Sequence, residues 1–325
     1  MVHKSVFIGV HPWLKCTVLK IIHEDAHLLV VQKPAGLVCH PTKDGERSSL
    51  IGRARLHLAG RVPSPAGILA PEQIGEGSSA VTPHLVNRLD RETSGVVLIA
   101  KNSGTAGELG KIFESRAVEK EYLAIVHGHV AAEQGTIDAP LGRDEHSVVA
   151  IKDRVRPDGV PAQTDFIVER RFVVGRAGGP LPAAGGASVL ASRLIGRFIQ
   201  TGQIGTLNHE FQPSPPTAFS LLRVIPRTGR KHQIRIHLAH LGHPIVGDKI
   251  YGGDEDLYLA LVENRLTEAQ RTKLIFANHA LHARALNFPW RGQAVEFVCE
   301  PEPWFTGFSN AKPQSYTRRQ ENRAS

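Results

Sequence analysis

The 325-residue sequence has very few cysteines and no long apolar run. Its three cysteines, Cys16, Cys39 and Cys299, lie far apart, and no C-x-x-C pair occurs. This spacing argues against a disulfide framework or a thiolate zinc site and favours a reducing compartment. The N-terminal residues show no apolar stretch long enough for a signal peptide or a membrane span. We therefore expect a cytoplasmic protein that does not enter a membrane.

Several motifs of common enzyme classes are missing as well. The sequence contains no P-loop, no dinucleotide-binding glycine fingerprint and no G-x-S-x-G, so nucleotide cofactors and serine-hydrolase chemistry lose support. A metal site remains an alternative, because His237 and His240, or His240 and His243, could converge on one helix face. No H-E-x-x-H pattern accompanies them. We favour histidines that are hydrogen-bonded or face RNA, and we expect no metal and no cofactor.

The charge of the chain is positive, with 39 Lys and Arg against 31 Asp and Glu and a formal net charge of +8. A basic balance of this size indicates a polyanionic partner, and nucleic acid is the first candidate. The alternative is that the excess charge only keeps the protein soluble. The apolar content of 41% is ordinary for a globular chain.

The chain is organised around residues 82–102, with the sequence TPHLVNRLDRETSGVVLIAKN. A crowded polar loop is followed by the short apolar run 96–100, which is typical of a buried strand. Further strands are expected at 28–31, 122–126, 147–151, 163–168, 219–225, 281–288 and 294–298, and a hairpin-like turn at 33–38. Helices are expected at 48–58, 104–116, 189–200, 231–241 and 257–265.

The low-complexity residues 175–216 cannot pack a core, and strand-like segments stand on both sides of them. We interpret them as an insertion into one catalytic domain that spans residues 21–305. Residues 59–81 have the composition of a loop. Residues 1–20 form an N-terminal extension, and 306–325 form a basic, disordered tail.

Asp90 is the first candidate for chemistry. Because Arg88 and Arg91 flank it, this carboxylate is expected to be ionised at neutral pH. An ionised, positioned carboxylate can act as a nucleophile, a general base or a metal ligand. The alternative, equally open from this stretch alone, is a surface salt-bridge loop that caps the strand.

A second cluster lies at an expected strand-turn-helix corner. Its cations, with one adjacent histidine, suit contact with RNA phosphates, although a solvated basic face is the alternative; they are Arg227, Arg230, Lys231 and His232. Arg235 differs from them because it adjoins the apolar stripe of the expected helix. A partly buried Arg requires a carboxylate partner, and Asp90 is the candidate.

Tyr122 begins an apolar strand in a chain with four tyrosines. The usual role of such a residue is core packing with the hydroxyl at the edge. The functional alternative is a flat ring on which a base can stack.

Together these motifs resemble the RluA-type family of pseudouridine synthases. The matching segments follow the family's order and are residues 28–41 (LLVVQKPAGLVCHP), 87–101 (NRLDRETSGVVLIAK), 120–128 (KEYLAIVHG), 228–252 (TGRKHQIRIHLAHLGHPIVGDKIYG) and 281–286.

The resemblance implies an α+β fold with a mixed, mainly antiparallel central sheet, flanking helices and a catalytic cleft. It implies that Asp90 is the catalytic aspartate, that Tyr122 lies against the target uracil, and that Arg235 pairs with Asp90. The family isomerises uridine in RNA: the N-glycosidic bond breaks, the base turns, and it rejoins the ribose through C5. A stacked base must first leave the helix, and the basic corner would hold the backbone. We expect a monomer that acts on rRNA or tRNA without a cofactor, with Arg88 and Arg91 also contacting RNA.

Two departures from the family pattern keep a second hypothesis open. Asn87 stands where the family commonly has His, and many relatives carry an N-terminal S4 RNA-binding domain that we do not expect here. The alternative is therefore a non-catalytic RNA-binding protein on the same scaffold. A metal-dependent hydrolase that uses the histidines is a third.

Overall fold

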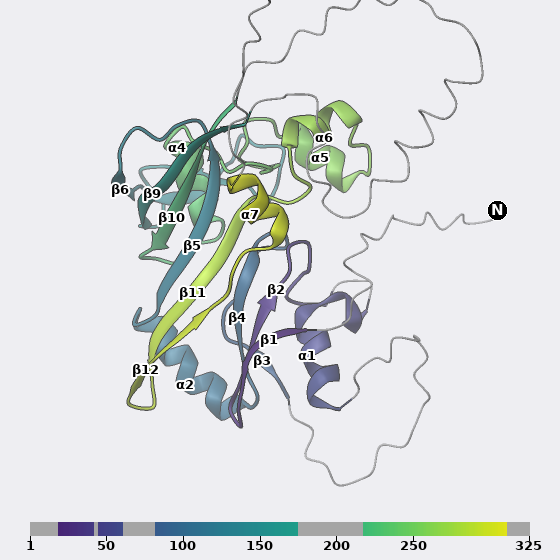
Figure 1. Cartoon of the computed structure of the whole chain (residues 1–325), viewed down its shortest axis with the longest axis vertical. Helices are drawn as coiled ribbons and strands as arrows, with labels where there is room; N and C mark the ends of the chain where they lie inside the picture. The colour runs from purple at the N-terminus through teal and green to yellow at the C-terminus, as the bar shows by residue number, and fades with distance from the viewer. Residues whose placement is uncertain (1–18, 42–44, 61–81, 175–216, 311–325) are drawn as a thin grey trace, which may run out of the picture.

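The computed structural model describes residues 19–41, 45–60, 82–174 and 217–310 (Figure 1). Most of the expected loop at 59–81, the helix at 189–200, the insertion at 175–216 and most of the expected terminal segments lie outside these ranges. The division into an extension, one catalytic domain and a tail therefore stays a prediction.

In the described residues, ten strands form one long mixed sheet, and two more form a small hairpin. The strands are β1 (Lys20–Glu24), β2 (Leu28–Lys33), β3 (His84–Leu85), β4 (Ser94–Ala100), β5 (Glu119–His127), β6 (Gln134–Asp138), β7 (Leu141–Arg143), β8 (Asp153–Val155), β9 (Gln163–Val174), β10 (Thr217–Pro226), β11 (Leu281–Trp290) and β12 (Gln293–Val298). The order in the large sheet is β1-β2-β4-β11-β5-β10-β9-β6, with β3 beside β4 and β12 beside β11. Only β4 and β11 pair in parallel; the other described pairs are antiparallel. This confirms the expected mixed, mainly antiparallel α+β fold.

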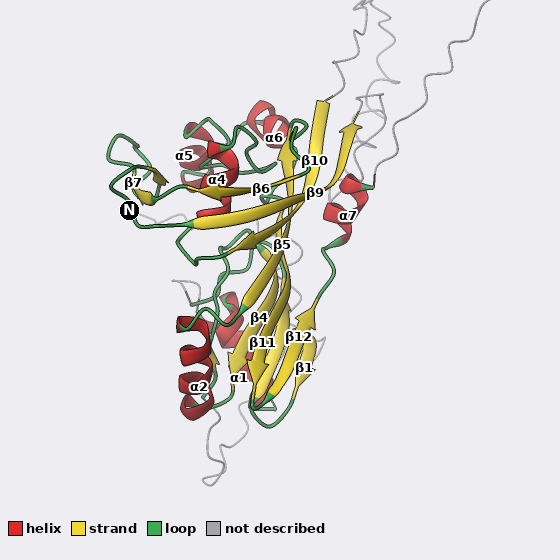
Figure 2. Cartoon of the chain, turned by 90° about the vertical axis from the view of Figure 1, so that its left-hand side faces the viewer, coloured by secondary structure: helices red, strands yellow, loops and turns green. Residues whose placement is uncertain are grey.

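The helices are α1 (Leu50–Leu58), α2 (Ser103–Glu114), α4 (Gln233–His240), α5 (Asp256–Val262), α6 (Glu268–Leu274) and α7 (Pro303–Ser309), with a short 3₁₀ turn, η2 (Glu46–Ser48). Figure 1 shows α1 and α2 beside one end of the sheet, with β1 to β4, and α4 to α6 beside the other, with β9 and β10. Figure 2 shows the sheet nearly edge-on, with α2 and α7 on different sides.

Strands β2 and β4 are buried along their whole length because helices cover both faces. Leu28 and Val30 belong to one apolar cluster with Leu109 of α2. Leu29 and Val31 belong to another, with Leu50 of α1. Continuous apolar runs, as opposed to alternating ones, are what a strand covered on two faces requires. The apolar run that follows the polar loop is thus a central strand, as expected.

The site-bearing elements meet where the sheet changes from one cluster to the next. Strands β5 and β10 and helix α4 share the largest apolar cluster, in which Ala124, Leu222, Ile234 and Leu238 are buried. This packing brings the start of α4 close to the loop that precedes β4, and residues of β5 line one cavity together with them. Because both helices and strands are packed into the core, their side chains reach the site from rigid supports.

Two sequence expectations are wrong. Residues 147–151 form turns, not a strand, because the Ser147 hydroxyl accepts from the Val149 N–H and holds the chain in a local turn. The bend at 33–38 does not join two paired strands: β2 pairs with β1 and β4, and Val38 makes only an isolated bridge to Ser49. In the described part of the chain, no helix is long and apolar enough to span a membrane.

Candidate active site

The loop before β4 is held from beneath by a buried lysine. Lys33 has no exposed surface, and its ammonium donates to the carbonyls of Pro34, Leu37 and Arg91 at 3.0, 2.7 and 2.9 Å. The Gly36 N–H donates to the same Arg91 carbonyl at 2.9 Å. Burial lowers the pKa of Lys33 to about 8. The turn at 33–38 therefore serves as a support for the loop.

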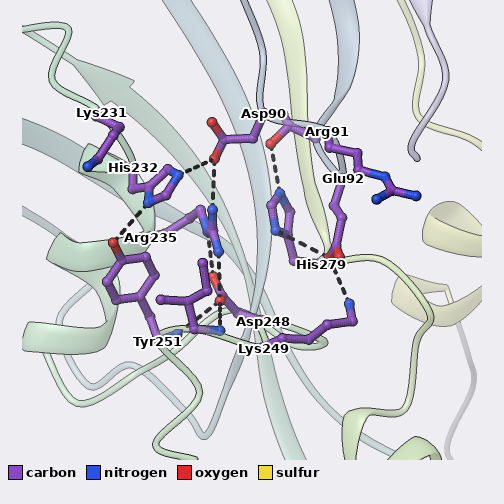
Figure 3. A network of polar contacts seen from close by, with 12 residues as sticks. Asp90, Arg91, Glu92, Lys231, His232, Arg235, Asp248, Lys249, Tyr251 and His279 are labelled. Atoms are coloured by element: carbon purple, nitrogen blue, oxygen red, sulfur yellow. Dashed lines mark hydrogen bonds and ion pairs between the residues drawn. The ribbon is translucent and has the colours of Figure 1, made fainter. Parts of the chain in front are cut away.

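The next two loop residues are fixed from the other side. The Lys249 ammonium, 3% exposed, donates to Glu92 Oε2 at 2.8 Å. The Thr93 hydroxyl lies 2.7 Å from His279 Nε2, and the His279 N–H donates to Glu92 Oε2 at 3.1 Å. Figure 3 shows Glu92, Lys249 and His279 of this arrangement. Each residue from 91 to 93 thus has its own anchor, so the backbone that carries Asp90 is preorganised.

Asp90 forms the expected pair with Arg235, and a second carboxylate completes it. Arg235 Nη1 donates to Asp90 Oδ2 at 2.8 Å. Its Nε and Nη2 donate to Asp248 Oδ2 and Oδ1 at 2.7 and 2.9 Å, a bidentate pair. The side chains of Asp248, Arg235 and Asp90 are 0%, 6% and 32% exposed. Asp248 is the buried anchor and Asp90 the outer, accessible member (Figure 3).

The charges keep both carboxylates ionised. Burial alone would raise the pKa of Asp90, but the charge and hydrogen bond of Arg235, together with contributions from His232 and His279, outweigh burial and lower the pKa below its usual range. For Asp248, burial is again opposed by Arg235, whose charge and hydrogen bonds hold the pKa far below normal. The Ile250 and Tyr251 N–H groups also donate to Asp248 Oδ1, at 2.9 and 3.0 Å. No hydrogen bond within the described residues engages Asp90 Oδ1.

Asp90 opens into a cavity of about 110 Å³. Tyr122, from β5, lines the same cavity, and burial keeps its hydroxyl protonated by raising its pKa. The other charged or aromatic lining residues are Arg88, Lys120, Arg230, His232 and Arg235. The structure thus brings the three residues expected to be catalytic together around one small cavity.

Of the four residues in the basic corner, Arg230 and His232 line the cavity, and Arg227 and Lys231 do not. Arg227 and Lys231 are exposed but paired, to Asp165 at 2.6 Å and to Asp153 at 2.9 Å. Arg91 is exposed outside the cavity, and its Nε donates to the Gly36 carbonyl at 3.3 Å.

Three of the cations that line the cavity differ from Arg227 and Lys231 in having no carboxylate partner in the described part of the chain. No ion pair with a carboxylate is found for Arg88, Lys120 or Arg230 among the described residues. Arg230 donates from Nε to the Pro161 carbonyl at 3.2 Å, and the Lys120 ammonium lies 5.6 Å from the centre of the Phe113 ring. Burial lowers the pKa of Lys120. Uncompensated positive charge is therefore concentrated at the cavity.

Asn87, which departs from the family pattern, faces the sheet. Its Oδ1 accepts from the Leu98 N–H at 2.7 Å, and its Nδ2 donates to the Val96 carbonyl at 3.2 Å. Asn87 does not line the cavity. Its amide acts as a short extension of the β4 ladder, a role that requires no charge.

Two of the three histidines considered as metal ligands form hydrogen bonds to other parts of the protein. His237 is buried, with Nδ1 2.8 Å from the Thr164 hydroxyl and Nε2 2.9 Å from the Ala139 carbonyl. His243 Nδ1 lies 2.8 Å from the His127 carbonyl. Within the described ranges, no group of three His, Cys, Asp or Glu side chains could hold a metal ion.

Sequence reasoning missed several supporting residues, although signals for them exist. Asp248 and Lys249 interrupt the apolar run PIVGDKIY, and Lys33 ends the apolar run LLVVQ. A charge inside an apolar run indicates a buried, paired group. The identity of each partner could not be read from this signal, because the partners are 13, 157 and 58 residues away.

A family model and a search of known proteins both indicate the same family. The family model described as RNA pseudouridylate synthase matches residues 27–240. Ribosomal large subunit pseudouridine synthase D of Zymomonas mobilis is 30% identical over 284 residues, covering 87% of this chain and 69% of that protein. The protein of the same name in Pseudomonas aeruginosa is 32% identical over 283 residues, covering 87% and 67%.

Two solved structures share the fold. Human RNA Pseudouridylate Synthase Domain Containing 1 and Domain Containing 4 each give a TM-score of 0.55, at 24% and 23% identity. Each covers 88% of this chain, and the match spans 84% and 90% of the human chains. With the family model covering most of the chain and relatives at 30% identity or above, this chain belongs to the RNA pseudouridylate synthase family.

Proposed function

We propose that this protein isomerises specific uridines of ribosomal RNA to pseudouridine, with Asp90 as the catalytic carboxylate. The observation that carries the proposal is the Asp90–Arg235–Asp248 arrangement. Arg235 binds Asp248 through two hydrogen bonds and Asp90 through one, which leaves Asp90 ionised, held in place, and with one oxygen facing the cavity. Binding RNA alone would require no such buried pair.

The cavity suits a flipped nucleotide. A base in a helix is inaccessible, so an enzyme that works on it must take it out of the stack and replace the lost stacking. The Tyr122 ring lines the cavity beside Asp90 and supports this role. Because buried groups such as Arg235 line the cavity, a nucleotide that fills it would meet the carboxylate with little competing water.

RNA binding is assigned mainly to the cations that lack a carboxylate. Arg88, Lys120 and Arg230 surround the cavity without an ion pair among the described residues, so they would hold phosphates close to the target nucleotide. Arg227 and Lys231 are partly neutralised by Asp165 and Asp153, and we expect weaker contributions from them. Arg91 and His232 are the other RNA-binding candidates from the sequence. Arg91 lies outside the cavity, and His232 lines it.

Ribosomal RNA is proposed over transfer RNA because the relatives from Zymomonas and Pseudomonas are named ribosomal large subunit pseudouridine synthase D. A monomeric, metal-free enzyme located in the cytoplasm stays our prediction, as does the insertion at 175–216.

The test is the variant Asp90→Asn, which keeps the side-chain shape and removes the charge. Tritium release from uridine-labelled ribosomal RNA should fall to background, while RNA affinity stays close to that of the unchanged protein. Asp256→Asn, on the exposed surface of α5, is the matched control and should retain full activity. Undiminished product from the Asp90 variant would refute the assignment.

The same assay separates the rival hypotheses. A non-catalytic RNA-binding protein would release no tritium in any form of the protein. A metal-dependent hydrolase would lose activity to chelators. The hypothesis of a non-catalytic RNA-binding protein arose partly from Asn87, which replaces the usual His of the family. The Asn87 side chain forms hydrogen bonds to the backbone of β4.

A further inference from the structure

His232 occupies an unusual position at the start of α4. Its backbone is in the left-handed region, with φ 55 and ψ 14, and it is the residue that precedes the helix. This position normally carries a Ser, Thr, Asp or Asn whose side chain caps the helix, but the His232 side chain caps nothing. Gln233 instead accepts from the Arg230 N–H at 3.0 Å. An uncommon conformation without a local role indicates that the ring is needed elsewhere.

The ring is fixed by a chain of hydrogen bonds that starts in the β7–β8 hairpin. The Asp153 N–H lies 3.3 Å from Tyr251 Oη, and Tyr251 Oη lies 2.9 Å from His232 Nδ1. The two rings meet edge-on at 75° with centroids 5.7 Å apart. Lys231 pairs with the Asp153 carboxylate at 2.9 Å and holds the hairpin in place. His232 therefore has one orientation.

The hydrogen-bond donors and acceptors around the His232 ring determine which ring nitrogen carries the proton. Tyr251 is buried, and burial raises its pKa, so the hydroxyl keeps its proton. The Asp153 N–H can only donate, which leaves the hydroxyl proton for His232 Nδ1. With Nδ1 protonated as well, the Tyr251 proton would have no acceptor among the described residues, at a cost in stability. Nδ1 is thus the acceptor, and Nε2 carries the proton.

The imidazole is neutral at physiological pH. Burial lowers the pKa of His232, the Arg235 charge adds to this effect, and the Asp90 charge opposes it without reversing it. Nε2 lies 3.8 Å from Asp90 Oδ2, which is longer than a hydrogen bond. His232 lines the cavity (Figure 3) and is 10% exposed. A fixed N–H donor without a partner in the described residues therefore points into the space beside Asp90.

We propose that the Nε2–H of His232 donates a hydrogen bond to a carbonyl oxygen of the target uracil. This inference rests on the proposed isomerase function and adds a catalytic residue to it. When the N1–C1′ bond breaks, its electron pair leaves with the base, and the negative charge spreads over O2 and O4. The base recovers neutrality when C5 bonds to C1′, loses its proton, and N1 gains one. A hydrogen-bond donor that is preorganised toward a carbonyl oxygen stabilises the uracil anion. A charged imidazolium would instead transfer its proton to that anion.

The first experiment reads the proton position without activity. In protein labelled with ¹⁵N-histidine, the resonances lost in His232→Gln identify His232 among the 17 histidines. At pH 7 we expect a protonated Nε2 and a bare Nδ1. Tyr251→Phe, which removes the hydroxyl and keeps the ring, should give a mixture of tautomers, while Tyr258→Phe on α5 should leave the signal unchanged. A protonated Nδ1, or a charged ring, in the unchanged protein would overturn the proposal.

The second experiment identifies the acceptor. Single-turnover rates are measured on RNA whose target uridine carries sulfur, a weaker acceptor, in place of O2 or of O4. His232→Ala should lower the rate about 100-fold with unchanged RNA affinity, and His232→Gln, which restores an N–H, should recover part of it. One of the two thio substitutions should slow the unchanged enzyme and leave the rate of His232→Ala unaffected. Equal slowing of both enzymes, or no slowing of either, refutes the contact.

Different results would refute the isomerase function and the role of His232. No pseudouridine from the unchanged protein would remove the isomerase function. Normal product from the unchanged protein together with a full rate for His232→Ala would remove only the role of His232.

Discussion

Arg235 carries one positive charge and faces two carboxylates, so the three side chains together hold a net negative charge inside the protein. The buried Asp248 takes two of the hydrogen bonds, and its remaining capacity is filled by two backbone N–H groups. Asp90 takes one and is the more exposed of the two. Because removing a partner from a buried ion pair leaves an uncompensated charge, Asp248 determines how Arg235, and through it Asp90, is positioned.

Asp248→Asn should therefore both destabilise the protein and slow the reaction. The new amide would turn an N–H toward an Arg235 N–H, and the free energy of unfolding should fall by about 3 kcal/mol. Urea denaturation checks the stability, and single-turnover tritium release checks the rate. The matched variant Asp256→Asn removes a carboxylate from an exposed pair with Arg265 and should change little. Asp248 would have no positioning role if its variant kept the normal rate.

Strands β4 and β11 approach each other closely next to the Asp90 loop. These strands form the parallel pair of the sheet, with His282 opposite Ser94 and Ala283 opposite Gly95. Gly95 has φ +126, and a Cβ atom there would lie 2.2 Å from the Ala283 carbonyl oxygen. Both the backbone conformation and the contact exclude a side chain. This glycine turns the chain from the Asp90 loop into the strand.

Gly95→Ala is therefore predicted to destabilise the protein by about 3 kcal/mol through backbone strain and overlap. Gly107→Ala is the matched control, because Gly107 lies in α2 and a Cβ atom there would meet nothing within 4 Å. That substitution should raise the free energy of unfolding by about 0.5–1 kcal/mol. Thermal and urea unfolding of both variants measures the difference. Similar effects of the two substitutions would contradict the account of β4 and β11.

Local pattern predicted much of the fold and part of the site. The apolar run at 96–100 and the helical spacing at 104–116 are confirmed as β4 and α2, because burial imposes its period on the sequence. The Asp90–Arg235 contact was also predicted, since a buried guanidinium requires a carboxylate. The second carboxylate on Arg235 was not predicted, because long-range partners are set by tertiary packing and leave no period along the chain.

The charged side chains of the described part of the molecule are paired unevenly. Arg223 and Arg227 on the β9–β10 side pair with Glu169 and Asp165. The cavity cations Arg88, Lys120 and Arg230 form no ion pair within the described residues. Neutralised charges release few counterions when a phosphate binds. The salt dependence of RNA binding should therefore follow the cavity and not the total charge.

Arg230→Ala should weaken RNA binding and lower the slope of log affinity against log salt by about 1. Arg227→Ala, in the same corner but paired with Asp165 at 2.6 Å, should lower the slope by less. Affinities measured at several salt concentrations by filter binding check both. Equal slopes for the two variants would place the phosphate contacts elsewhere.

The stability of the whole molecule in acid should depend on two buried histidines behind the site. Burial lowers the pKa of His279 and of His282 to about 4, below the value of about 6.5 in an unfolded chain. His279 lies against Thr93 and Glu92, and His282 between Ser94 and the Cys299 carbonyl. Between pH 6.5 and 4 the unfolded chain binds protons that the folded protein excludes.

The stability contributed by the neutral histidines is therefore complete above about pH 6.5 and is lost as the pH falls toward 4. Each histidine can account for up to about 3 kcal/mol over this range. The depressed carboxylates Asp90 and Asp248 act the same way only at lower pH, because their folded pKa values lie below the usual range. Urea unfolding from pH 7 to 4 should show a falling free energy, and His279→Gln should reduce the slope by up to one proton. An unchanged slope in that variant would mean that His279 is already protonated in the folded protein, and would contradict the effect expected from its burial.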